Sequence, residues 1–187
     1  MSSIKLIGIA GVARCGKDSL YKALYVLNHS FIRHSFADKV KEDVRPVISR
    51  MYNIDILNCS PEEKEKCREI MVNYANIRRE EDASHWIKEI EPKVLSSISS
   101  NLIPVLTDVR YENEVKWIQS LGGKVFHLTK FSGAGEDKTI HPPANSVEAR
   151  HDPLARTASD FQIEWEDNLS QPDMITFAKN ILKNYEI

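Results

Sequence analysis

The segment Gly11-Val12-Ala13-Arg14-Cys15-Gly16-Lys17 decides the fold, because it joins two segments of opposite character. Before it, Ile4 to Ala10 is a short, mostly apolar run, which is typical of a strand buried on both faces. After it, residues 17–28 carry leucine and alanine at helical spacing. A G-x-x-x-x-G-K segment between such a strand and such a helix predicts a phosphate-binding loop, in which backbone N–H groups and the helix N-terminus surround a phosphate group.

Individual residues of this loop have predicted roles. Lys17 is expected to be exposed in the free protein and to reach the β- and γ-phosphate oxygens of a bound nucleotide. Arg14 either adds positive charge near the γ-phosphate or is a solvated loop arginine. Asp18 stands where the common motif has Ser or Thr, and it either binds Mg²⁺, directly or through water, or only caps the first helical turn. The residues expected to bind the nucleotide are Gly11, Ala13, Arg14, Cys15, Gly16, Lys17, Asp18 and Ser19.

A second apolar strand, Leu102 to Thr107, ends in Asp108 and Arg110. Ligands of open α/β sheets lie beyond the carboxyl ends of the strands, so both side chains are expected beside the phosphate-binding loop. Asp108 would orient the Mg²⁺ shell or an attacking oxygen, and Arg110 would bind a phosphate in bidentate fashion. In the alternative interpretation, Asp108 caps the following helix and Arg110 pairs with Glu114.

Strands and helices alternate along the chain, which indicates a parallel sheet covered on both faces. We therefore expect an α/β protein with three layers, α/β/α, and a mostly parallel central sheet of about five strands. Besides the two strands above, strands are expected at 31–36, 124–129 and 160–165. Helices are expected at 38–52 with a kink or a restart at Pro46, from Ser60 onward, at 83–99 with a bend at Pro92, at 112–121 and at 172–184.

Composition restricts the class of protein. The 187 residues suit one domain, and 42% hydrophobic with 28% charged residues is ordinary for a globular chain. A net charge of −2 argues against general nucleic-acid or membrane-surface binding. The three cysteines are irregularly spaced and are interpreted as reduced thiols. Without a signal-peptide pattern or an apolar run of membrane-spanning length, a cytoplasmic location is expected.

Together these residues resemble the deoxynucleoside monophosphate kinases encoded by bacteriophages. That family's loop also ends in G-K-D followed by Ser or Thr, as Gly16-Lys17-Asp18-Ser19 does. Ser35 to Lys41 resembles the family's Phe-Ala segment, which leads into a lysine-bearing helix. The most specific match is Thr107-Asp108-Val109-Arg110-Tyr111-Glu112-Asn113-Glu114, where the family has Asp-Val-Arg-aromatic-x-Asn-Glu. The family's His-x-Ser-Glu segment is matched only loosely, by His141, Ser146 and Glu148, and we assign these no catalytic role.

The resemblance implies one kinase domain of the P-loop NTPase fold, with a helical substrate-binding region over about 37–99. It implies transfer of the ATP γ-phosphate, with Mg²⁺, to the 5′-phosphate of a deoxynucleoside monophosphate, in the host cytoplasm if the chain is phage-encoded. A homodimer is compatible with it. The implied roles are catalysis by Lys17, Asp108, Arg110 and Arg14, metal binding by Asp18 and Asp108, and acceptor binding by Lys41, Arg68, Arg78, Arg79, Trp86, Asp108, Arg110 and Glu114.

The segment 130–158 is long, is rich in Gly, Pro and His, and shows no hydrophobic periodicity, which predicts a lid. Its closure would exclude water, and Arg150 and Arg156 would then reach the triphosphate. The alternative is a disordered surface loop. No metal site is expected from His141, His151 and Asp152, because they lack metal-ligand spacing.

Two other functions fit the same motifs. A kinase with this loop can act on another acceptor, such as a hydroxyl group on a modified base in DNA, or phosphomevalonate. The chain can also be a non-catalytic nucleotide-binding module. The Asp108-to-Glu114 segment favours the enzyme.

Overall fold

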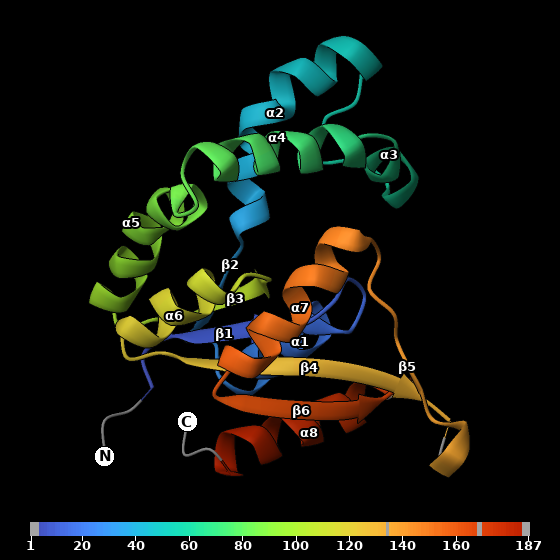
Figure 1. Cartoon of the computed structure of the whole chain (residues 1–187). Coiled ribbons are helices and arrows are strands. Elements are labelled where there is room, and N and C mark those ends of the chain that lie inside the picture. The colour runs from blue at the N-terminus through green and yellow to red at the C-terminus, as the bar shows by residue number, and fades with distance from the viewer. Residues whose placement is uncertain (1–3, 134, 168–169, 185–187) are drawn as a thin grey trace. The chain divides into compact units, whose positions relative to one another are not determined.

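The computed structural model describes residues 4–133, 135–167 and 170–184. Contacts within the chain divide it into two compact units (Figure 1). The sheet unit comprises Met1–His34 and Lys93–Ile187, and the helical unit comprises Ser35–Pro92. Within the described residues, no helix is both long enough and apolar enough to span a membrane.

The sheet confirms the predicted α/β class. Five strands run parallel in the order β2-β3-β1-β4-β6, and the short β5 pairs antiparallel with the end of β4. Ala10, the last residue of β1, lies beside Val109, the last residue of β3, so the carboxyl ends of these two strands meet at one edge, while β4 continues beyond His127, the neighbour of Ala10, to Ser132. The strands are β1 (Ile7–Ala10), β2 (Phe31–His34), β3 (Ile103–Val109), β4 (Lys124–Ser132), β5 (Thr139–Ile140) and β6 (Phe161–Glu166).

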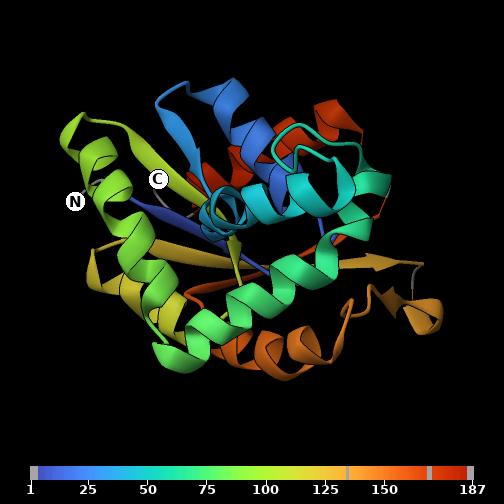
Figure 2. The ribbon, with the colours of Figure 1, turned by 90° about the horizontal axis from the view of Figure 1, so that it is seen from above.

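Helices cover both faces of this sheet (Figure 2). On one face, α1 (Lys17–Leu27) packs against α8 (Gln171–Asn184), and both bury apolar side chains with those of β1, β4 and β6. On the other face lie α6 (Glu112–Ser120) and α7 (Ser146–Ala158), which pack against each other and against β1. A 3₁₀ turn at Gly135–Asp137 precedes β5.

The helical unit has its own core. It contains α2 (Phe36–Tyr52), α3 (Pro61–Lys66), α4 (Arg68–Glu81) and the first half of α5 (His85–Ser99). The core residues are Val44, Ile48, Ile54, Ile56 and Cys67. Ser60 opens α3 with a capping box, since its hydroxyl accepts from the Glu63 N–H and the Glu63 carboxylate accepts from the Ser60 N–H.

The structure corrects two expectations about helices and narrows a third. α2 continues through Pro46 without a restart, and the flanking Val44 and Ile48 are buried and offset the missing N–H, while the alternative of a kink stays a prediction. The helix expected from Ser60 is divided at Cys67, whose N–H bonds to several carbonyls of the last turn of α3. Residues 146–158, expected to be aperiodic, form α7; its buried residues are Glu148 and Ala155, so it has no apolar stripe to detect.

Candidate active site

The predicted phosphate-binding loop has a shape that requires its two glycines. Gly11 and Gly16 have φ angles of +130° and +101°, which favour glycine. A Cβ atom on Gly11 would lie 2.5 Å from the Leu128 carbonyl oxygen, and one on Gly16 would lie 1.8 Å from Cζ2 of Trp165. The loop is therefore pressed against β4 and β6, and its glycines permit that approach.

Trp165 of β6 supports this loop, although the sequence offers no local signal for it. Its indole Nε1 donates to the Cys15 carbonyl oxygen at 2.8 Å, and its ring lies against Gly16. Cys15 is completely buried, and burial raises the pKa of its thiol. Cys15 is thus a neutral packing residue inside the loop, while its carbonyl holds the tryptophan.

Lys17 turns back into the loop. Only 8% of the residue is exposed, so the expectation of an exposed charge in the free protein is wrong. Its Nζ donates to the carbonyl oxygens of Gly11 at 2.7 Å and Val12 at 2.6 Å. Burial lowers the pKa of Lys17, with a further contribution from the nearby Arg110 guanidinium, while Asp108 and Asp18 oppose the shift.

The structure brings together the residues predicted at the ends of the first two apolar strands. Ala10, which precedes the loop, lies beside Val109, which stands between Asp108 and Arg110, and the Arg110 guanidinium and the loop N–H of Ala13 share the Glu148 carboxylate. Asp18 lies in the first turn of α1 with a side chain that is 75% exposed, and its carboxylate lies 3.8 Å from Nε of Arg33. Mg²⁺ usually takes one or two carboxylates together with substrate phosphates, and a role of Asp18 and Asp108 in holding it stays a prediction. Among the described residues, no cluster of three or more His, Cys, Asp or Glu could cage a metal ion.

The Arg110 side chain pairs with a residue of the loosely matched His-x-Ser-Glu segment, to which the sequence analysis assigned no catalytic role. Its guanidinium forms an ion pair with Glu148 of α7. The alternative prediction, a pair with the Glu114 side chain, is replaced by a different contact. Glu114 is 2% exposed, and its carboxylate accepts from the backbone N–H groups of Arg110 at 2.8 Å and Tyr111 at 3.1 Å. The buried Glu114 carboxylate therefore caps the N-terminus of α6.

The segment leading into α7 lies on the phosphate-binding loop. Glu148, 6% exposed, accepts from the Ala13 N–H at 3.2 Å and the Ala144 N–H at 2.9 Å. The Nε2 atom of His141 lies 3.1 Å from the Ala13 carbonyl oxygen. These contacts join residues more than 120 positions apart, so periodicity and spacing could not reveal them.

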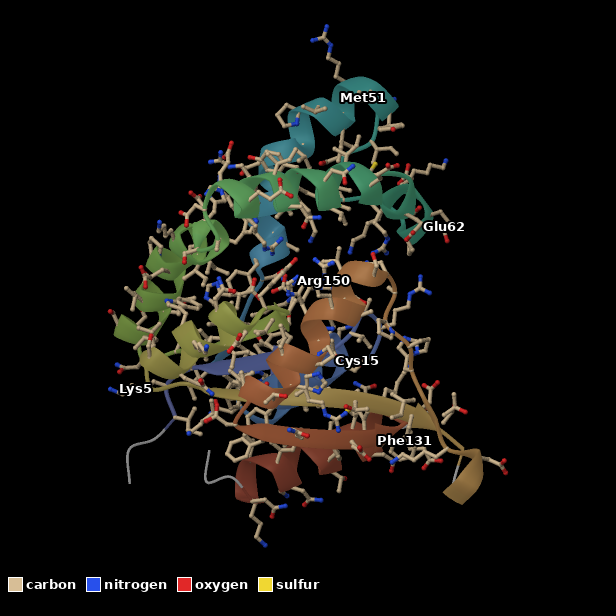
Figure 3. The ribbon with its side chains drawn as sticks, in the orientation of Figure 1. Lys5, Cys15, Met51, Glu62, Phe131 and Arg150 are labelled. Carbon is tan, nitrogen blue, oxygen red and sulfur yellow. The ribbon has the colours of Figure 1, made fainter. Side chains whose placement is uncertain are left out.

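The two arginines expected to reach the triphosphate from the predicted lid lie on α7. Arg150 is exposed there (Figure 3). Arg156 lies eight residues beyond Glu148, about 12 Å further along the helix. Its guanidinium approaches Gln162 at 3.1 Å and Glu164 at 3.7 Å, both on β6. Arg156 thus contacts β6 in this structure, and its expected contact with the triphosphate after closure stays a prediction. Arg14 is exposed with φ at +63°, and its role stays open.

Residues predicted to bind the acceptor from the helical unit have partners within that unit. Lys41 pairs with Asp38 at 2.9 Å, Arg68 with Glu65 at 2.7 Å and Arg78 with Glu81 at 2.6 Å. Trp86 is buried and donates from Nε1 to the Ala75 carbonyl oxygen at 3.1 Å. A role in acceptor binding for these residues, and for Arg79, stays a prediction.

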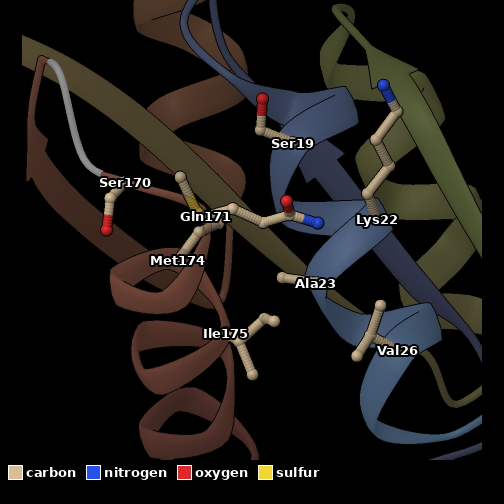
Figure 4. A pocket seen from close by; sticks show the side chains of 8 residues that line it. All are labelled: Ser19, Lys22, Ala23, Val26, Ser170, Gln171, Met174 and Ile175. Atoms are coloured by element: carbon tan, nitrogen blue, oxygen red, sulfur yellow. The ribbon is translucent and has the colours of Figure 1, made fainter.

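A pocket of about 330 Å³ lies between α1 and α8 (Figure 4). Ser19, the last of the predicted nucleotide-binding residues, stands at one end of it. From Ser19 the pocket continues along α1, and polar and apolar side chains line it in equal number. Its lining residues are Ser19, Lys22, Ala23, Val26, Ser170, Gln171, Met174 and Ile175.

Comparison with solved structures identifies the fold. The dephospho-CoA kinase from Campylobacter jejuni has 13% sequence identity and a TM-score of 0.51, and the likeness covers 98% of this chain and 98% of that chain. The protein TT1252 from Thermus thermophilus has 12% identity and a TM-score of 0.50, with 98% of each chain covered. At these identities the likeness shows the fold alone, which is the three-layer fold of P-loop kinases. No protein-family model and no curated protein sequence matches the chain.

Proposed function

We propose that the chain is a phosphotransferase that moves the γ-phosphate of ATP to the 5′-phosphate of a deoxynucleoside monophosphate. One observation carries the proposal. The Lys17 ammonium lies inside the loop bounded by Gly11 and Gly16, and Arg110, from the end of β3, pairs with the same Glu148 carboxylate that accepts from the loop N–H of Ala13. Phosphoryl transfer spreads negative charge over several oxygens, so fixed cations and N–H donors in one place are what the reaction needs.

Each of these groups has a defined task. Lys17 exchanges its bonds to the Gly11 and Val12 carbonyls for bonds to phosphate oxygens. Arg110 presents a planar guanidinium that can bind two oxygens of the acceptor phosphate. Asp108 orients the groups around the transferred phosphate. Mg²⁺, when bound, neutralises phosphate charge, and Asp18 and Asp108 are the carboxylates that would hold it, directly or through water.

The acceptor is inferred from the Asp108-to-Glu114 segment, which resembles that of the phage deoxynucleoside monophosphate kinases. The structure gives this segment two tasks, since Arg110 points its guanidinium to Glu148 beside the loop and Glu114 fixes the start of α6. The pocket between α1 and α8 begins at Ser19, close to the loop, and its mixed polar and apolar lining suits the base of the nucleotide.

A different acceptor is the second candidate. The similar structure from Campylobacter jejuni is a dephospho-CoA kinase, so dephospho-CoA belongs among the compounds to be tested.

One assay tests both candidates. ADP release from Mg-ATP is measured by enzyme coupling with dAMP, dGMP, dCMP, dTMP, phosphomevalonate and dephospho-CoA, each added separately. We expect release with at least one deoxynucleoside monophosphate, and none with the Lys17→Met variant. ADP release with dephospho-CoA alone would show that the acceptor is not a deoxynucleoside monophosphate, while the proposal of a phosphotransferase would stand. Nucleotide binding without release in any arm would identify a non-catalytic module.

A further inference from the structure

Glu148 places a carboxylate among groups that ordinarily bind phosphate oxygens. One of its oxygens accepts from the backbone N–H of Ala13, a residue of the phosphate-binding loop, at 3.2 Å. Its other oxygen pairs with the Arg110 guanidinium. Backbone N–H groups of such loops and an adjacent arginine are donors suited to phosphate, and a carboxylate shares the negative charge and the paired oxygens of that ligand.

A helix cap alone does not explain this position. The N-terminus of α7 already has its cap, because the Asn145 side chain accepts from the Glu148 N–H at 2.9 Å. A glutamate three residues after the cap usually reaches back to the cap residue itself. Glu148 does reach back, to the Ala144 N–H at 2.9 Å, but the same oxygen also reaches Ala13. The contacts with Ala13 and Arg110 therefore need an explanation beyond capping.

His141 strengthens the same contact from the other end of the segment. Its Nε2 lies 3.1 Å from the Ala13 carbonyl oxygen, so residues 141 to 148 approach both polar groups of one peptide residue of the loop. The Lys17 ammonium is likewise bonded to loop carbonyls. In the free protein, these polar groups of the loop are satisfied from within the chain.

We propose that Glu148 is a built-in competitor of nucleotide phosphate, and that residues 141–148 form a latch that must release Ala13 and Arg110 before a triphosphate binds fully. The carboxylate and a phosphoryl group cannot occupy the same donors, and their like charges repel at close range. The latch thus makes nucleotide binding and movement of the α7 N-terminus one coupled event. This inference rests on the proposed function, because it takes the competing ligand to be nucleotide phosphate.

The first test measures the affinity of β,γ-imido-ATP with Mg²⁺ by calorimetry. Glu148→Gln removes the negative charge and keeps the size of the side chain. We expect it to bind the analogue at least tenfold more tightly than wild type, which is about 1.4 kcal/mol. Glu166→Gln is the matched control, since it removes the same charge from an exposed position on β6, and it should bind as wild type does.

The second test uses the wild-type protein, so it does not depend on the variant folding. The Ala144 amide signal in ¹H–¹⁵N spectra should shift strongly as the analogue saturates the protein, because Glu148 leaves that N–H.

Specific outcomes would overturn the latch. The first is a folded Glu148→Gln variant that binds the analogue no more tightly than wild type does. The second is a Glu166→Gln variant whose affinity rises as much as that of Glu148→Gln, and the third is an Ala144 signal that stays unchanged when the analogue saturates the protein. In each of these outcomes the protein still binds the analogue, so the proposed function stands. Failure of both folded proteins to bind the analogue would instead remove the proposed function, and the latch with it.

Discussion

Replacing Gly16 by alanine should destabilise the protein by about 2–5 kcal/mol, although it adds only one methyl group. The backbone at Gly16 has φ at +101°, and an L-residue in the left-handed region costs about 1–2 kcal/mol. The new Cβ would also lie 1.8 Å from Cζ2 of Trp165, so the buried ring or the loop must move. Overpacking of this kind costs about 1–3 kcal/mol. The sum is a large share of a typical stability of about 5–15 kcal/mol.

The two contributions can be measured separately by urea unfolding followed by circular dichroism. Gly122→Ala is the matched control, because Gly122 has φ at +75° and a Cβ there would meet no atom within 4 Å. It should show the backbone cost alone. Trp165→Leu removes the ring, so the double variant with Gly16→Ala should show a coupling energy of about 1–3 kcal/mol. Additivity of the two single changes within about 0.5 kcal/mol would refute the steric reasoning.

Four further predictions concern single side chains. Lys17→Met should lower the rate of ADP formation at least about 100-fold. Its free energy of unfolding should stay within about 1 kcal/mol of the wild-type value, because the variant loses the hydrogen bonds of the ammonium but no longer buries a charge. A drop in melting temperature that corresponds to more than about 1 kcal/mol would contradict this. Arg110→Lys should lower kcat/KM for the monophosphate about 30- to 1000-fold, or about 2–4 kcal/mol, with little change in KM for ATP; wild-type efficiency would mean that the guanidinium serves Glu148 alone. Asp18→Asn should weaken the Mg²⁺ dependence of the rate more than nucleotide binding without metal, and equal losses would make Asp18 a helix cap. Burial raises the pKa of Asp160, but hydrogen bonds from Lys124, Gln119 and the Val125 N–H bring it below its ordinary value. The ionised Asp160 therefore stabilises the fold above about pH 4, and this stabilisation fades as the pH falls further. In urea unfolding, the free energy of unfolding of Asp160→Asn should be lower than that of wild type at pH 7, and the difference should shrink towards pH 3. A difference that stays constant would exclude this linkage.

The sequence predicted the sheet unit well where local pattern and burial agree. β1 and β3 are buried nearly throughout, so their apolar runs were visible, and the glycines of the loop were marked by the motif. α7 was missed because its fixed points are a cap at Asn145 and a buried carboxylate at Glu148. Such a helix is held by polar contacts with distant residues, and these leave no period in the sequence.

The candidate site was predicted in part for the same reason. Lys17, Asp18, Asp108 and Arg110 follow the ends of two buried strands, and these ends lie side by side in the sheet, as the pairing of Ala10 with Val109 shows. The burial of Lys17 could not be seen in the motif, because it depends on how the loop closes over its own lysine. Trp165 could not be identified either, since nothing near it in the chain distinguishes a loop support from an ordinary core tryptophan.

The contact between Cys15 and Trp165 also sets the order in which the molecule can be completed during its synthesis. The two residues are separated by 150 positions, and Ala13 and Glu148 by 135. Ribosomes add about 5–20 residues per second, so about 8–30 s pass between the synthesis of the loop and that of its tryptophan support. Throughout that interval the nascent chain carries the whole phosphate-binding motif without the contacts that shape it. Bringing residues so far apart in the chain together also costs loop-closure entropy, so the loop takes its final shape late in the folding of each new molecule.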